Sequence, residues 1–276
     1  MKKFIALCVL TAACLVLAGT TVYASTVRTV TLTYNRARAI FNEYTRAETE
    51  DARIINERTL REFIANMENA AMQIIVAQSR LTLEEESLRH AYIRYNFGLI
   101  SADMLQTAQR RLAQQQADLE NAQASFLALQ REFNQMLGLP IRQNTLLTWT
   151  RTLTGAPENI DRFIRTRMHN APQLRALQEQ HFIPDGVMEA ARRTAENNIH
   201  AAYTALVQLV EQATLAQQAY ENAVKELETA ITRHEMGQIT RFDVEMAQHQ
   251  LLVSEIALET LRNRQWAAEF RLLHPH

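Results

Sequence analysis

Glycine, proline and cysteine are scarce in this sequence. Only 6 Gly and 5 Pro occur in 276 residues, so tight turns must be few and helices can run long without interruption. Both cysteines precede residue 25, in a segment that reads as a removable leader. The chain that remains after removal of this leader has no disulfides and no thiol chemistry.

Lysine is also scarce, and neither sign of charge is in excess. Three lysines are present, arginine carries most of the positive charge, and the formal net charge is −1. No basic block points to nucleic acid. The eight histidines form no metal-ligand spacing, and no phosphate-binding loop, nucleophile elbow or clustered acid pair occurs. We therefore expect no enzyme, no cofactor and no metal.

A long apolar run occurs only at the start of the chain. Residues 1–24 have the pattern of a signal peptide: two lysines, an apolar stretch, and a small-residue cleavage site before Ser25. The alternative is a lipoprotein signal that leads to lipidation at Cys14. No later segment is apolar enough over about 18 residues to span a bilayer as a helix. We expect an exported protein of the periplasm or cell envelope, associated with the outer membrane only through partners.

The rest of the chain carries apolar residues at intervals of seven, with a companion position three residues later. This spacing, sustained over four or more heptads, indicates coiled-coil helices. Many companion positions are alanine, which allows helices to approach closely. The four ladders begin at Leu60, Leu105, Ile199 and Val244 and end at Tyr95, Phe133, Leu227 and Leu272.

Two short breaks, at residues 96–99 and 235–238, each contain one glycine. A glycine just past a helix end supplies a left-handed cap, and a short loop makes the next helix antiparallel. The sequence therefore predicts two helical hairpins, each with a first arm of about 50 residues and a second of about 35. Similar segments recur at a period near 140 residues, which indicates an internal duplication.

We predict an all-α fold of two antiparallel coiled-coil hairpins with shorter helices at 34–47 and 157–180. The first repeat covers residues 25–138 and the second 157–276. Residues 139–156 form a linker between the repeats, and a short strand or extended strap is expected near 145–150.

Four segments carry a resemblance to a known family. Residues 94–100 (RYNFGLI) and 234–240 (HEMGQIT) resemble the two periplasmic tips of TolC-type outer-membrane factors. The segments 137–140 (LGLP) and 170–175 (NAPQLR) are also similar to that family. The resemblance implies a homotrimer in which each protomer gives two hairpins to a 12-helix tunnel. It also implies docking to a periplasmic adaptor protein, which in turn meets an inner-membrane pump.

The resemblance also implies roles for individual residues. Asp243 and Asp103 are candidates for a constriction of the tunnel, although Met246 replaces a second aspartate of the family. Alternatively, the tip glycines are only helix caps, Arg94 is a solvated helix-end side chain, and Asp243 stabilises the start of its helix. The candidate adaptor-docking residues are Arg94, Asn96, Phe97, Gly98, Leu99, Met236, Gly237 and Gln238.

The sequence departs from the family where strands of a membrane barrel are normally inserted. In the second repeat that interval shrinks to residues 182–187. In the first repeat, residues 25–97 contain no Gly or Pro, and we expect no strands there. The hypothesis is therefore a passive TolC-like export duct without the family's barrel strands. The alternative is a non-transporting envelope scaffold or binding protein.

Overall fold

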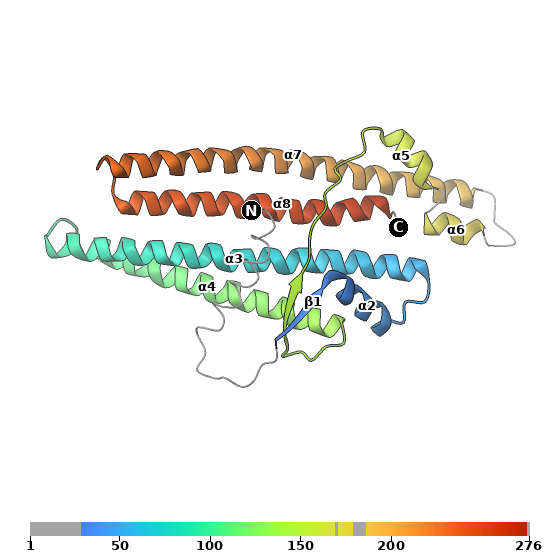
Figure 1. The fold of residues 1–276 in the computed structure, drawn as a ribbon, viewed down its shortest axis with the longest axis horizontal. Helices are drawn as coiled ribbons and strands as arrows, with labels where there is room; N and C mark the ends of the chain where they lie inside the picture. The colour runs from blue at the N-terminus through green and yellow to red at the C-terminus, as the bar shows by residue number, and fades with distance from the viewer. Residues whose placement is uncertain (1–28, 169–170, 179–185, 275–276) are drawn as a thin grey trace. The chain divides into compact units, whose positions relative to one another are not determined.

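The computed structural model describes residues 29–168, 171–178 and 186–274 (Figure 1). The predicted signal peptide, Cys14 and residues 182–185 of the short interval in the second repeat lie outside the described residues. The elements, in chain order, are β1 (Thr29–Thr33), α2 (Tyr34–Tyr44), α3 (Glu50–Asn96), α4 (Ala102–Met136), β2 (Asn144–Thr148), α5 (Ile160–Arg167), α6 (Pro172–Gln178), α7 (Val187–Glu235) and α8 (Arg241–Leu273).

The predicted all-α fold is confirmed. The first arms of the hairpins, α3 and α7, have 47 and 49 residues, and the second arms, α4 and α8, have 35 and 33. The seven-residue ladders explain these lengths, because they place apolar side chains along one face of each helix. Ladder residues that the structure buries include Leu60, Met67, Ile74, Phe126, Phe133, Ile199, Leu206 and Leu272.

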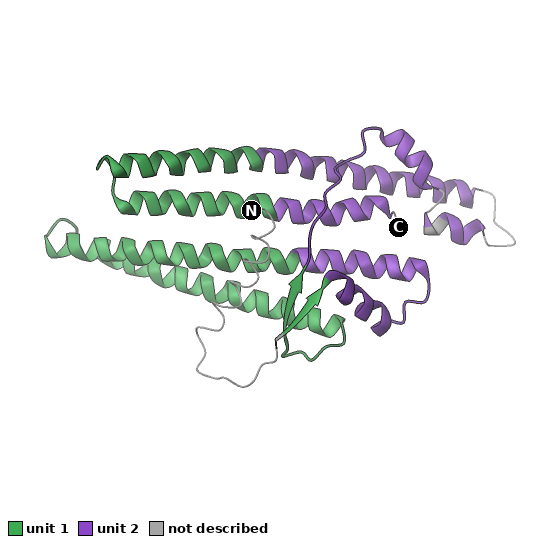
Figure 2. Cartoon of the chain, viewed as in Figure 1, with its two compact units in different colours: residues 1–33, 66–148, 216–259 green, residues 34–65, 149–215, 260–276 purple. Residues whose placement is uncertain are grey.

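The chain divides into two compact units, and each contains parts of both repeats (Figure 2). Of the described residues, unit 1 holds 29–33, 66–148 and 216–259, which include both helical tips. Unit 2 holds the remaining described residues, in the segments 34–65, 149–215 and 260–274. Both candidate tips therefore belong to the same compact unit.

Unit 1 contains the only sheet among the described residues, a parallel pair in which Thr29 faces Asn144 and Thr33 faces Thr148. Strand β2 confirms the strand expected near residues 145–150. Strand β1 was not expected and corrects the prediction that residues 25–97 hold no strand. Its sequence TVTLT alternates β-branched and apolar residues, and its partner lies more than 100 residues away in the chain.

Buried polar residues of α4 anchor β2 within unit 1. Asn134 is fully buried, and its side-chain amide donates to the carbonyl of Gln143 at 2.7 Å. Its side-chain oxygen accepts a hydrogen bond of 2.7 Å from the hydroxyl of Thr145, which is also fully buried. Each of these buried polar atoms thus has a hydrogen-bond partner in the protein in place of water, as buried polar groups require.

Unit 2 packs α5, α7 and the end of α8 around a core of Ile164, Ile199, Leu206 and Leu272. An extended strap, residues 149–157, lies along α8 in the same unit. The Trp149 ring packs on the Trp266 ring with centroids 4.4 Å apart. This contact makes the two tryptophans part of the packing between the strap and α8.

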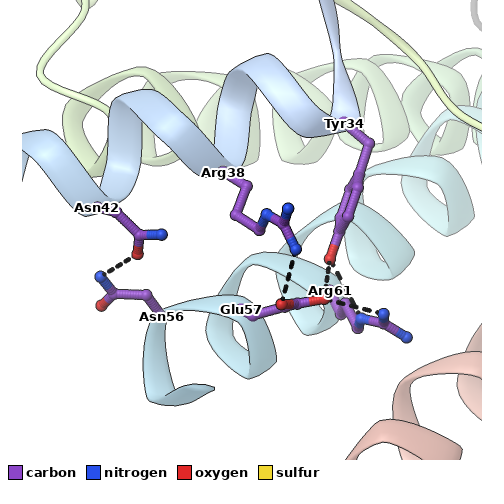
Figure 3. A network of polar contacts seen from close by, with 6 residues as sticks. All are labelled: Tyr34, Arg38, Asn42, Asn56, Glu57 and Arg61. Carbon is purple, nitrogen blue, oxygen red and sulfur yellow. Dashed lines mark hydrogen bonds and ion pairs between the residues drawn. The ribbon is translucent and has the colours of Figure 1, made fainter. Parts of the chain in front are cut away.

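A polar network joins α2 to α3 in unit 2 (Figure 3). Glu57 accepts hydrogen bonds from Tyr34 at 3.0 Å and Arg61 at 3.0 Å, and it pairs with Arg38 at 3.1 Å. Burial raises the pKa of the Tyr34 hydroxyl to about 12. Burial also acts to raise the pKa of Glu57, but the hydrogen bonds from Arg61 and Tyr34 and the two arginine charges outweigh it and lower that pKa.

Candidate functional site

The first tip is a glycine cap at the end of α3. The N–H of Gly98 donates to the carbonyl of Tyr95 at 2.9 Å, and the N–H of Leu99 donates to that of Arg94 at 2.8 Å. Gly98 has a φ of +72°, where any side chain would be strained although no atom blocks a Cβ. This pair of bonds is the Schellman motif, which satisfies the last carbonyls of a helix.

The second tip repeats the first bond for bond. The N–H of Gly237 donates to the carbonyl of His234 at 2.8 Å, and that of Gln238 donates to Arg233 at 2.9 Å. Gly237 has a φ of +70°. Since 237 − 98 = 139, the two caps lie one repeat period apart. Both glycines therefore act as helix caps, which is the simpler of the two roles considered for them.

The helices that leave the two tips start differently. At the first tip, the Ser101 hydroxyl accepts a hydrogen bond from the N–H of Met104 at 3.3 Å. The side chain of Met104 accepts no hydrogen bond from Ser101 in return. At the second, the Thr240 hydroxyl accepts the N–H of Asp243 at 3.3 Å. The Asp243 carboxylate in turn accepts the N–H of Thr240 at 2.8 Å and its hydroxyl at 2.7 Å. Only the second tip therefore has a reciprocal capping box.

The capping box engages the Asp243 carboxylate locally. The hydrogen bonds from the hydroxyl and the backbone N–H of Thr240, and to a smaller degree the charge of Arg233, lower the pKa of Asp243. Asp103, the other candidate for a constriction, lies exposed in the first turn of α4. Both aspartates belong to unit 1, each at the start of its own helix, and their role in a constriction stays a prediction.

The candidate docking residues are exposed, and the first tip is the more apolar. Phe97 and Leu99 are 75% and 68% exposed, and Met236 at the second tip is 65% exposed. Asn96 and Gln238 are exposed as well. Further exposed apolar side chains near the first tip, which sequence reasoning did not single out, are Tyr92, Ile93, Tyr95 and Met104.

A groove of about 390 Å³ runs beside the first tip. Helices α3 and α4 of the first hairpin line it, and Phe242 from the start of α8 contributes one wall. The rings of Phe242 and His90 meet edge to face, with centroids 5.4 Å apart. Sequence patterns could not reveal this groove, because it depends on contact between residues 152 positions apart.

The groove lining combines guanidinium groups with an apolar floor. Arg94 and Arg111 line it and are exposed, while Ile100 and Phe242 are partly buried. No Asp or Glu among the described residues lines it. Elsewhere, the described residues contain no cluster of His, Cys, Asp or Glu able to hold a metal ion, and none of their helices is long and apolar enough to cross a membrane.

Comparisons with known proteins place this fold. No protein-family model and no curated protein matches the sequence. Among solved structures, CusC, whose structures concern folding and transmembrane channel formation, is 14% identical with a TM-score of 0.54. That match covers 97% of this chain and 91% of CusC. The outer membrane protein VceC of Vibrio cholerae is 17% identical with a TM-score of 0.50, over 86% of this chain and 72% of VceC.

The chain therefore has the fold of TolC-type outer-membrane efflux channels. The resemblance of the tip segments is confirmed at the level of the fold, which spans nearly the whole described chain. The two solved structures compared above are described as an outer membrane protein and as a protein that forms a transmembrane channel. At these identities the likeness concerns the fold alone, and the assembly and partners of this chain are matters for the following proposal.

Proposed function

We propose that this protein is the periplasmic duct component of a tripartite efflux or type I secretion system. Three copies close a helical tunnel through which the exported molecule passes passively, and an inner-membrane pump supplies the energy. The observation that carries this proposal is the pair of tips with the same capping bonds, one repeat apart, in a chain with the fold of outer-membrane channels.

The tips are the proposed docking surface for a periplasmic adaptor protein. Rigid caps at Gly98 and Gly237 hold the loops in one conformation, so that little conformational entropy is lost on binding. The exposed Phe97, Leu99 and Met236 provide apolar area that a partner can cover. Asp103 and Asp243 are proposed to line the tunnel near its entrance.

The assembly is tested by size-exclusion chromatography with light scattering on the mature protein. We expect a particle of three times the protomer mass. A monomer that persists at high protein concentration would contradict the tunnel and favour the non-transporting scaffold. Fractionation of cells would then show whether the protein lies in the soluble or the membrane pool.

Docking is tested by site-specific cross-linking in cells that contain the cognate adaptor. Cysteine is introduced at the tips by Leu99→Cys or Gln238→Cys, since all native cysteines lie before residue 25. We expect a cross-link to the adaptor from both tips. The matched control is Gln208→Cys, at an exposed position of α7 away from the tips. Equal cross-linking from the control would contradict docking at the tips.

A further inference from the structure

The duplication provides an internal reference for the groove at the first tip. A shift of 139 residues aligns Arg94 with Arg233, so both hairpins carry an arginine at the fourth residue before the capping glycine. The same shift places Met104 on Asp243 and Arg111 on Gln250. The first hairpin therefore has an apolar residue where the second has an acid, and an additional cation where the second has an amide.

This exchange changes the electrostatics of the two arginines. Arg233 has a carboxylate nearby, and its charge acts on Asp243. Arg94 has Met104 at the corresponding place instead. In the described part of the chain, neither Arg94 nor Arg111 forms an ion pair, and the groove that they share is lined by no acid. A negative charge placed in this groove would meet two guanidinium groups without an internal competitor.

The floor of the groove accepts apolar groups. Ile100, Met104 and Phe242 line it, and its volume of about 390 Å³ is in the range of small-molecule sites. Phe242 is fixed by its edge-to-face contact with His90, so this wall exists before a ligand arrives. The groove thus offers an apolar surface beside two unpaired cations.

We propose that this groove binds a small amphipathic anion, with its carboxylate between Arg94 and Arg111 and its apolar chain against Met104 and Phe242. The ligand carboxylate takes the place that Asp243 occupies in the second repeat. A larger cavity of about 630 Å³ between α2 and α3 is a weaker candidate, because three arginines and four glutamates line it together and largely balance each other's charge. The proposal does not depend on docking of an adaptor at the tips.

Decanoate is the test ligand, and calorimetry on the mature wild-type protein measures its binding. We expect a dissociation constant below about 1 mM for decanoate. Acetate, 1-decanol and decyltrimethylammonium should each bind at least about tenfold more weakly, because each lacks the apolar chain, the charge or its sign. Hydrogen exchange should show protection by decanoate at residues 87–111 and around Phe242, and not at residues 226–238 of the second tip.

Three variants test the residues. Arg94→Gln and Arg111→Gln should each weaken decanoate binding by about tenfold or more. Met104→Asp supplies an internal carboxylate, as in the second repeat, and should weaken it similarly. All three positions are exposed, and circular dichroism checks that the helices are retained. Arg233→Gln, the matched control in the second repeat, should change binding by less than about twofold.

Several results would overturn the proposal. Equal binding of decanoate and 1-decanol would show that the arginines do not recognise the negative charge of the ligand carboxylate. Loss of binding in Arg233→Gln, or full binding in the Arg94→Gln and Arg111→Gln double variant, would place the ligand elsewhere. If decanoate failed to bind while an acidic peptide bound to residues 87–111, the groove would be a protein-docking surface and not a small-molecule site.

Discussion

Arg46 is the only non-glycine residue in the described part of the chain with a positive φ, at +52°. It ends α2 with the same two bonds that glycine forms at the tips: its N–H donates to Glu43 at 3.2 Å and that of Ala47 donates to Asn42 at 2.9 Å. The left-handed conformation costs a side-chain-bearing residue about 1–2 kcal/mol. Arg46 therefore occupies a position whose backbone conformation favours glycine.

We predict that Arg46→Gly stabilises the protein by up to about 1 kcal/mol, because the relief of strain exceeds the added flexibility of the unfolded chain. Urea unfolding measures the change. The control is Glu85→Gly, at an exposed position inside α3. Glycine in the interior of a helix should destabilise the protein by about 1 kcal/mol. A loss of stability in Arg46→Gly would mean that the arginine side chain makes a compensating contact.

The capping box of the second tip gives a second prediction at the residue scale. Thr240→Ala should destabilise the protein by about 1 kcal/mol at pH 7, since it removes the cap of α8. The folded-state pKa of Asp243 is lowered, so its contribution is present above its ordinary pKa of about 3.9 and is lost as the pH falls through the folded pKa.

Unfolding of the Asp243→Asn variant across pH checks the ionic part of this cap. Wild type should be the more stable at pH 7, and the difference should shrink below pH ~4. Ser101→Ala at the first tip removes a cap without a reciprocal acid, and its effect should not depend on pH in this range. A difference between wild type and Asp243→Asn that stays constant to low pH would show that the charge is not responsible.

At the scale of elements, one carboxylate holds the strap between the repeats. Glu269 is 5% exposed and accepts the N–H of Gly155 at 2.8 Å, the N–H of Thr154 at 3.0 Å and the amide of Gln265 at 3.0 Å. Together with the Trp149–Trp266 contact, these bonds fix the strap along about one turn of α8 in unit 2.

We predict that Glu269→Ala destabilises the protein by about 3 kcal/mol, because it removes the buried carboxylate that accepts hydrogen bonds from the N–H groups of Thr154 and Gly155. Urea unfolding measures the loss, and proteolysis should cut first at residues 149–157 if the strap is released. Glu228→Ala, at an exposed position on α7, is the control and should change stability by less than about 0.5 kcal/mol. An equally small effect of Glu269→Ala would contradict the role of the carboxylate.

The sequence predicts the long helices well and predicts poorly the features that depend on tertiary contacts. The heptad ladders and the paired glycines locate four helices, because those signals depend on local spacing. Strand β1 is different, since five alternating residues gain stability only by pairing with β2 far along the chain. The Glu57 network and the groove wall at Phe242 likewise arise from tertiary contact, which spacing in one segment does not encode.

At the scale of the whole chain, the two hairpins contact each other within unit 2, where Arg61 of α3 lies over the Trp266 ring of α8, and also within unit 1. The Ser79 hydroxyl on α3 and Nδ1 of His249 on α8 lie 2.9 Å apart. Burial, and then the charge of Arg80, lowers the pKa of His249. The neutral imidazole is therefore the form that the folded contact favours.

The sign of the pH effect follows from this shift. Between the lowered folded pKa and the unfolded value of about 6.5, the unfolded state binds more protons, so stability rises with pH. We predict that the wild-type protein loses stability as the pH falls from 7 to 5. The contribution of His249 should be below about 1 kcal/mol, because the ring is only partly buried and solvent screens its charge.

Urea unfolding at a series of pH values tests this coupling of the hairpins. His249→Gln removes the titrating group while it keeps a polar side chain opposite Ser79, and it should flatten the pH dependence between 5 and 7. His200→Gln alters an exposed histidine of α7 in unit 2 and should retain the wild-type slope. If His249→Gln kept that slope and His200→Gln lost it, protonation would act outside the contact between Ser79 and His249.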